Sequence, residues 1–322
     1  MLKSPKTALL VLALLLLSSS WNVQANGKKA QASNRSDAIM LQPSAVINYV
    51  RPYLSNIYDD RYAGPADIWN PNKGFLVQST NPESYSLNFP TTGAHNLYFD
   101  LLITGIEPEE LTWEPVTHEG ITATVTNVVP NDYWIPYEDG GQVVARVKLI
   151  GPEARNQWYN PHPNPIAKPK LPQTFELVGR DINTNDEVVK YGFVLRQWFV
   201  SRGHTWRDYS DYSAWCDSLG YRMPRVRDLT NAKCGVRGDM VFFPCINGIN
   251  SAMPSSDWNG YRRHIGAGFF TEWGSVGIYA DSGFSENSMT SDGSASSKFH
   301  VNTYEGDVLL SDGPAYGVCT TP

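Results

Sequence analysis

The sequence predicts an α+β protein that is mostly β. Its 322 residues include 10 Trp, 17 Tyr and 12 Phe, a content of aromatic residues that favours strands. The 26 Gly and 22 Pro indicate many turns. Helical periodicity is clear in one segment only, residues 206–219. These observations exclude a helix bundle, and 41% hydrophobic with 18% charged residues excludes a wholly disordered chain.

The charge balance argues against a nucleic-acid partner. The chain has 26 Lys and Arg against 32 Asp and Glu, for a net charge of −6. A chain this acidic has no general attraction to polyanions such as nucleic acid.

The first 25 residues read as a signal peptide. Lys3 and Lys6 precede an apolar run over residues 8–17, and the segment ends in the small residue Ala25. A membrane anchor is the alternative, but the run is shorter than the roughly 20 residues that span a bilayer. We expect cleavage after Ala25, no integral membrane segment afterwards, and a secreted or cell-surface location, with the periplasm also open. The polar residues 26–45 are expected to be a flexible leader.

Short β-type runs follow in the next part of the chain. Alternation of apolar and polar residues is clearest at 121–126 and 144–150, and turn residues separate the runs at intervals typical of a sandwich. We therefore predict an immunoglobulin-like β-sandwich. The expected strands lie at residues 74–78, 85–89, 97–104, 121–129, 143–150, 175–178 and 188–200.

The last third combines a helix with short strands. Trp206, Tyr209, Cys216 and Leu219 recur at steps of three and four, which places them on one helix face, and Gly220 follows as a stop. A second helix is expected at 225–232. Short strands are expected at residues 269–270, 297–301, 308–310 and 316–319.

The four cysteines all lie in this last third. For an exported chain, the even set Cys216, Cys234, Cys245 and Cys319 suggests two disulfides, with three pairings formally possible. The spacings lack the compact pairs of a zinc site, so no metal is expected.

Several segments carry a resemblance to a known family. The order of residues 206–229, 268–274 and 316–319 resembles the C-type-lectin-like adhesion domain of bacterial invasin and intimin-type adhesins. Residues 74–85 and 191–199 are similar to the same family, in which a β-rich module precedes the lectin-like one. The resemblance covers roughly residues 70–322.

The resemblance implies a domain organisation and a disulfide pattern. It implies an immunoglobulin-like domain over 46–189, following the signal peptide (1–25) and leader (26–45), and a C-type-lectin-like adhesion domain over 190–322. A cysteine on the first helix then joins one on the last strand, which gives Cys216–Cys319 and leaves Cys234–Cys245.

The resemblance also implies a function in recognition. We expect an exported adhesion protein that binds a protein or glycan on a host or neighbouring cell, without catalysis and without a cofactor. Calcium-dependent lectins bind the ion through Glu-Pro-Asn or Gln-Pro-Asp and a later Trp-Asn-Asp, and none of these three-residue motifs occurs in the last third of this sequence. The most similar segment, residues 258–260, lacks the final carboxylate. A structural envelope protein and a secreted hydrolase are the alternatives. The six histidines lack metal spacing and no nucleophile elbow is present, so an enzyme is not expected.

One aromatic and basic segment stands out as a candidate ligand site. Trp, Tyr and Arg dominate binding hot spots, and residues 257–264 contain all three. An alternative is that Trp258 or Tyr261 plugs the loop core while the arginines are solvated. Trp273 is then expected to be buried and Glu272 to pair with an arginine such as Arg222 or Arg225. The candidate ligand-binding residues are Trp258, Tyr261, Arg262, Arg263 and Trp273, expected in one exposed patch.

Overall fold

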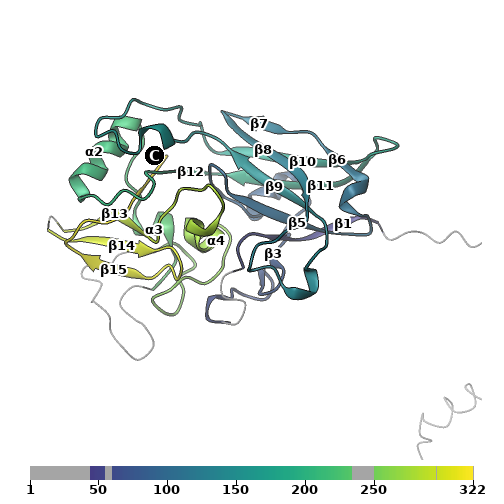
Figure 1. Cartoon of the computed structure of the whole chain (residues 1–322). Coiled ribbons are helices and arrows are strands. Elements are labelled where there is room, and N and C mark those ends of the chain that lie inside the picture. Colours follow the sequence, from purple (N-terminus) through teal and green to yellow (C-terminus); the bar gives the residue numbers. More distant parts are fainter. Residues whose placement is uncertain (1–43, 55–59, 234–249, 295, 322) are drawn as a thin grey trace, which may run out of the picture. The chain divides into compact units, whose positions relative to one another are not determined.

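The computed structural model describes residues 44–54, 60–233, 250–294 and 296–321, which fall within one compact unit, Pro43–Pro322. It confirms the mostly β, α+β class (Figure 1). The domain boundary expected between residues 189 and 190 falls within strand β11 (Glu187–Leu195), and it stays a prediction.

The largest sheet has seven strands. Side chains along β9 (Val144–Ile150) alternate between buried and partly exposed, as the sequence predicts, so Val147 and Leu149 enter the core. The strand order is β2 (Trp69–Asn70), β3 (Gly74–Leu76), β1 (Val46–Arg51), β5 (Tyr98–Thr104), β9, β8 (Ile121–Val128) and β7 (Val116–His118).

A second sheet packs against the first. It consists of β11, β10 (Gln173–Asp181) and β6 (Leu111–Trp113). Phe99 of β5 lies 6.0 Å, centroid to centroid, from both Tyr191 and Phe193 of β11. The two antiparallel sheets therefore bury aromatic side chains between them, as in a β-sandwich.

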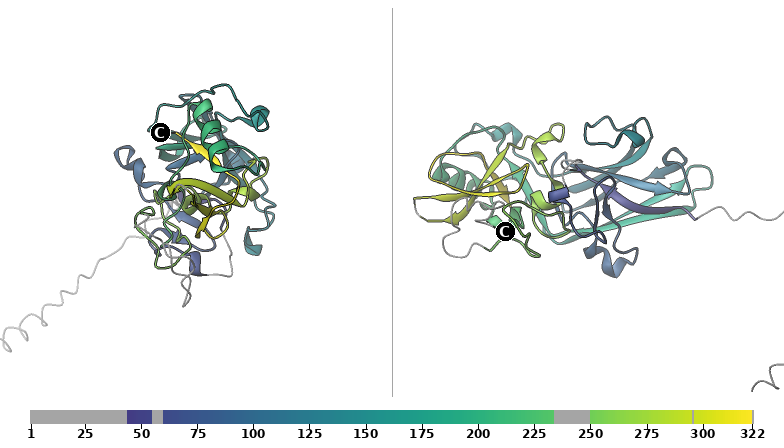
Figure 2. Two further views of the ribbon diagram at one scale, coloured as in Figure 1. Left: turned by 90° about the vertical axis from the view of Figure 1, so that its left-hand side faces the viewer. Right: turned by 90° about the horizontal axis from the view of Figure 1, so that it is seen from below.

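Two further sheets belong mainly to the C-terminal part. In one, β12 (Gln197–Ser201) pairs antiparallel with β16 (Val318–Thr320) and parallel with β4 (Thr92–Ala94). The other contains β13 (Asn287–Gly293), β14 (Lys298–Asn302) and β15 (Val308–Ser311), drawn in yellow tones in Figure 2. Strand β12 thus joins segments more than 100 residues apart in the sequence.

The helices are short. The α-helices are α2 (Tyr209–Leu219), α3 (Val226–Leu229) and α4 (Phe269–Trp273). The 3₁₀ helices are η1 (Asp60–Tyr62), η2 (Pro82–Leu87), η3 (Pro108–Glu110), η4 (Tyr137–Asp139), η5 (Arg155–Gln157) and η6 (Val276–Ile278).

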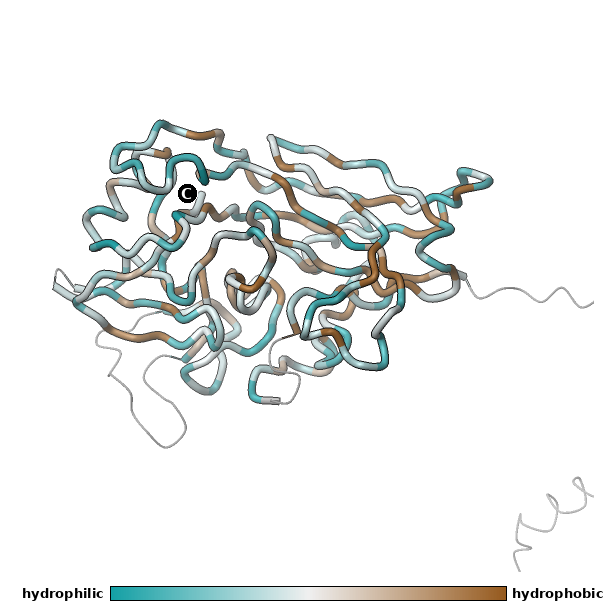
Figure 3. Tube along the Cα trace, in the orientation of Figure 1, coloured by the Kyte–Doolittle hydropathy of each residue, from teal (hydrophilic) through white to brown (hydrophobic). Residues whose placement is uncertain are grey.

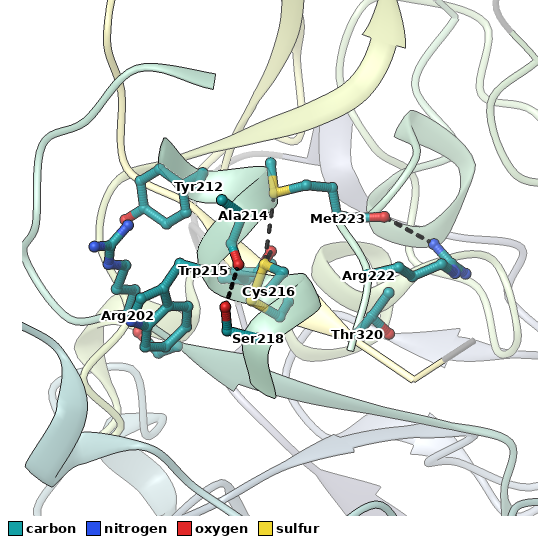
Figure 4. The surroundings of a disulfide bond; sticks show 12 residues. Arg202, Tyr212, Ala214, Trp215, Cys216, Ser218, Arg222, Met223 and Thr320 are labelled. Atoms are coloured by element: carbon teal, nitrogen blue, oxygen red, sulfur yellow. Dashed lines mark hydrogen bonds between the residues drawn. A yellow bond between two sulfur atoms is a disulfide. The ribbon is translucent and has the colours of Figure 1, made fainter. Parts of the chain in front are cut away.

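Helix α2 confirms the predicted helix but starts later. Asp208 is its N-cap, and Gly220 closes it at φ 83°, a left-handed conformation that glycine adopts without strain. Trp206 therefore precedes the helix instead of sharing its buried face. The helix places Cys216 beside β16, where the predicted Cys216–Cys319 disulfide is present (Figure 4). Cys234 and Cys245, the other predicted pair, lie outside the described residues.

Two strand predictions are wrong. Residues 85–87 form the second half of helix η2, and residues 88–89 follow it. The helix starts because Pro82 suits a first helical turn and the Asn81 side chain accepts a hydrogen bond from the N–H of Glu83 (3.1 Å). Residues 269–270 belong to helix α4, which lies between Gly268 (φ 105°) and Gly274 (φ 73°).

Two other elements differ in extent. The run predicted at 188–200 is two strands, because the N–H of Arg196 donates to the carbonyl of Thr91 (2.7 Å) and β12 turns to another sheet. The helix predicted at 225–232 is only the short α3.

The core is largely aromatic. Trp198, Trp215 and Trp273 are completely buried. Hydrophobic segments, brown in Figure 3, run along the central strands and through α4. Burial of such large side chains supplies the main driving force for folding.

Candidate functional site

The expected exposed patch around residues 258–273 does not form. Tyr261, Arg263 and Trp273 are each 0% exposed, so the prediction of a shared exposed patch is wrong for these three residues. The alternative that aromatics plug the loop is correct for Tyr261. Its hydroxyl donates to the carbonyl of Tyr304 (2.8 Å), and its ring packs against Tyr62.

Arg263 is an internal connector. Its guanidinium donates to the carbonyls of Glu272 (2.7 Å) and Tyr53, and lies 4.7 Å from the centroid of the Trp69 ring. Burial lowers the pKa of Arg263. A cation held by backbone carbonyls and an aromatic ring ties the C-terminal part to the N-terminal strands.

Glu272 and Trp273 are internal too. The Glu272 carboxylate accepts hydrogen bonds from the N–H and hydroxyl groups of Thr91 and Thr92 and from the N–H of Gly266. Burial raises the pKa of Glu272, and these donors oppose that shift. Trp273 donates from Nε1 to the carbonyl of Thr92 (2.9 Å).

The expected pairing of Glu272 with Arg222 or Arg225 is wrong. Arg222 pairs with Asp228 at 2.7 Å, and the N–H of Arg225 also donates to that carboxylate. The N–H and hydroxyl groups of Thr91 and Thr92 converge on the Glu272 carboxylate and satisfy it without an arginine.

Trp258 and Arg262 reach the surface in part. Trp258 is half-buried beside Tyr62, with ring centroids 5.5 Å apart. Arg262 forms a bidentate ion pair with the exposed Asp257 (2.7 and 3.1 Å). A ligand-binding role for these two residues stays a prediction.

A different aromatic group is exposed, at the entry to helix α2. Trp206 is 49% exposed and meets the Tyr316 ring edge-to-face, with centroids 5.0 Å apart. His204 and Arg207 flank it, and both are exposed. We call His204, Trp206, Arg207 and Tyr316 the Trp206 surface.

The backbone beneath the Trp206 surface is fixed from several sides. Arg207 and Ala315 exchange two backbone hydrogen bonds of 3.0 and 2.9 Å. The hydroxyl of Thr205 donates to the carbonyl of Arg202 (2.8 Å), and the hydroxyl of Tyr212 donates to the carbonyl of Thr205 (2.8 Å).

Arg202 anchors the start of the same segment. Its guanidinium lies over the Tyr212 and Trp215 rings, 5.2 and 4.9 Å from their centroids, as Figure 4 shows. Burial lowers the pKa of Arg202 and raises that of Tyr212. Cys216 lies about one helix turn after Tyr212, and its disulfide partner Cys319 lies three residues after Tyr316.

This arrangement suits recognition by contact. A rigid, half-exposed indole offers a flat apolar face, and Arg207 and His204 add hydrogen-bond donors beside it. Trp206 is not among the predicted site residues because its spacing from Tyr209 fits a buried helix face. Asp208, a residue type that favours the N-cap position, is the signal that could have placed the start of the helix after Trp206.

The described part of the chain contains neither a cluster of metal ligands nor a membrane-spanning helix. There, no three His, Cys, Asp or Glu side chains come together as a metal site requires. No helix among those residues is long and apolar enough to cross a bilayer.

Comparison with known proteins gives one structural likeness. No protein-family model matches the chain, and no curated protein matches it. The chain is similar to the crystal structure of invasin, described as a bacterial integrin-binding protein, with a TM-score of 0.46 and 12% sequence identity. The match covers 87% of this chain and 40% of the invasin chain, so it spans less than half of that protein.

Proposed function

We propose that the chain is an exported recognition protein that binds a cell-surface protein or glycan through its C-terminal, C-type-lectin-like part, residues 190–322, without catalysis. The observation that carries the proposal is the Trp206 surface. An indole that is 49% exposed leaves apolar area in water, although the backbone around it is tightly fixed. Burying such a ring against a ligand recovers that free energy at little cost in conformational entropy.

The resemblance of the residue order to invasin and intimin-type adhesins supports the same proposal. In that family the lectin-like domain follows a β-rich module and carries adhesion. The disulfide between Cys216 and Cys319, which the resemblance implied, is present.

A binding array tests this function. The purified protein is applied to glycans and to purified cell-surface proteins, and the same preparation is assayed with generic glycoside and ester substrates. We expect saturable binding to at least one array member and no turnover. Turnover without binding would show that the chain is a hydrolase, and neither activity would favour a structural envelope protein.

Export belongs to the same proposal. The basic start, apolar run and Ala25 of the N-terminal segment support cleavage after residue 25. Intact-mass measurement of the chain recovered outside the cytoplasm should give a mature protein that begins at Asn26. Recovery of the uncleaved chain in the cytoplasm would contradict export.

A further inference from the structure

A long connection joins two strands that are already paired. Strands β8 and β9 form a ladder that continues to the pair Val128–Val144, yet residues 129–143 lie between them. Hairpin loops usually need only about 2 to 5 residues. The length of this connection, which we call the 129–143 loop, is therefore not required by the sheet.

A buried tryptophan fixes the middle of the 129–143 loop. Trp134 is 4% exposed, and its ring centroid lies 5.2 Å from Tyr53, 5.8 Å from Tyr279 and 6.5 Å from Tyr98. The loop is thus packed onto the body of the protein.

Two ion pairs fix the loop on either side of Trp134. Asp132 pairs with Arg146 at 2.7 Å, and Asp139 pairs with Arg51. Arg51, Asp100 and Arg146 are register partners on β1, β5 and β9, so they form one row across the sheet. Because the loop is held by this row, little entropy is lost when it binds a partner.

The anchored loop exposes three large apolar side chains. Val129 is 54% exposed, Tyr133 is 70% exposed and Tyr137 is 99% exposed. Tyrosine is among the residue types that dominate protein interfaces, since it offers a large ring with few rotatable bonds and a hydroxyl.

The charge of the loop indicates the kind of partner. It carries three carboxylates, Asp132, Glu138 and Asp139, and no Lys or Arg. Glu138 is exposed, and 31% of the Asp139 side chain is exposed. Because Asp132 and Asp139 are paired with Arg146 and Arg51, the charge offered to a partner comes mainly from Glu138, next to Tyr137. This negative charge disfavours nucleic acid and acidic glycans and favours basic side chains.

We propose that the 129–143 loop is a protein-docking surface for a partner that presents basic and apolar side chains. This surface lies in the β-rich part and includes no residue of the Trp206 surface. It therefore gives the chain a second contact with a protein, independent of the recognition proposed for residues 190–322.

Selection from random dodecapeptides displayed on phage tests this proposal. The purified protein is the target, and the double variant Tyr133→Ser with Tyr137→Ser is the subtractive target. Enriched peptides should combine Arg or Lys with apolar residues. Their affinity should fall about tenfold or more in the double variant and should also fall at high salt, because the charges are near the surface.

Matched variants separate this surface from others. Ile182→Ser removes an exposed apolar side chain (62% exposed) from the loop between β10 and β11, and it should leave the affinity unchanged, as should Trp206→Ala. Glu138→Lys should weaken binding without touching a tyrosine. The proposal is overturned if no peptide is enriched, if the enriched peptides are acidic, or if the double variant binds them equally well.

Discussion

The Glu272 carboxylate is bound to Thr91, 181 residues earlier in the chain, through both the N–H (3.1 Å) and the hydroxyl (2.8 Å) of that threonine. Glu272 lies on α4 and Thr91 immediately precedes β4, so this contact joins the C-terminal part to the strand that pairs with β12. Glu272, which the sequence suggests pairs with an arginine, thus holds the fold together through hydrogen bonds to threonines instead.

Replacement of Glu272 should strongly destabilise the protein. In Glu272→Ala, the buried N–H groups of Thr91, Thr92 and Gly266 lose their acceptor, which should lower the free energy of unfolding by about 3 kcal/mol or more. Urea unfolding measures the change. Glu109→Ala, at an exposed glutamate, is the control and should change stability by less than about 0.5 kcal/mol. Equal stability of the two variants would contradict the connecting role.

Adjacent arginines should behave in opposite ways. Arg263→Ala should lower the free energy of unfolding by about 3 kcal/mol or more, because a buried cation with carbonyl partners and aromatic contacts is lost. Arg262→Ala removes a surface ion pair with Asp257 and a long hydrogen bond to the carbonyl of Ala63 (3.4 Å), and it should cost less than about 1 kcal/mol. Thermal unfolding of the two variants measures the difference. A larger loss of stability in Arg262→Ala than in Arg263→Ala would contradict the internal structural role of Arg263.

The disulfide should contribute strongly to stability. Cys216 and Cys319 are separated by 103 residues, and the chain-entropy model assigns about 4 to 5 kcal/mol to closing a loop of that size. The double variant Cys216→Ala with Cys319→Ala should show a loss of this order in denaturant unfolding under non-reducing conditions. An unchanged unfolding midpoint would mean that the bridge adds nothing to the packing of α2 on β16.

Stability should fall on mild acidification, partly because of His300. This residue on β14 is 7% exposed, and burial lowers its pKa below the ordinary value of 6.5. Between pH 6.5 and that lower pKa, the unfolded chain binds a proton that the folded chain does not. The contribution of neutral His300 to the free energy of unfolding is therefore fully present above pH 6.5, and it is lost as the pH falls through this window.

The His300→Gln variant measures that contribution. Its free energy of unfolding should depend less on pH below 6.5 than that of the unchanged protein, by at most about 1.4 kcal/mol per pH unit. His95, whose pKa burial also lowers, is retained in both proteins and cancels in the comparison. Identical slopes would show that His300 binds protons equally in both states.

Alternation and turn residues were enough to predict much of the sandwich. Strands β5, β8 and β9 lie within one residue of their predicted limits. One face of β8 and of β9 is buried, which gives the alternation, whereas the first four residues of β5 are all buried. Short elements such as β4 were missed, since their partners are distant in sequence and leave no local pattern. Helix α4 was mistaken for a strand because its five residues are all buried, which removes any periodicity.

The candidate site was harder to predict than the fold. Composition marked 257–264 as aromatic and basic, but it could not show that Arg263 has carbonyl partners from Tyr53 and Glu272. Burial of a cation depends on such long-range partners. Trp206 shows the opposite case, an exposed residue whose spacing predicts a buried helix face. The helix begins at Tyr209, after Trp206.

The most direct test of recognition through the C-terminal part is the dissociation constant of the strongest ligand from the array, measured for the unchanged protein, Trp206→Ala and Tyr159→Ala. Tyr159 is 77% exposed and lies outside the Trp206 surface, so it controls for the loss of any exposed ring. We predict that Trp206→Ala weakens binding about tenfold or more with an unchanged melting temperature, while Tyr159→Ala binds normally. Equal affinity of Trp206→Ala and the unchanged protein would contradict the proposal that this surface recognises the ligand.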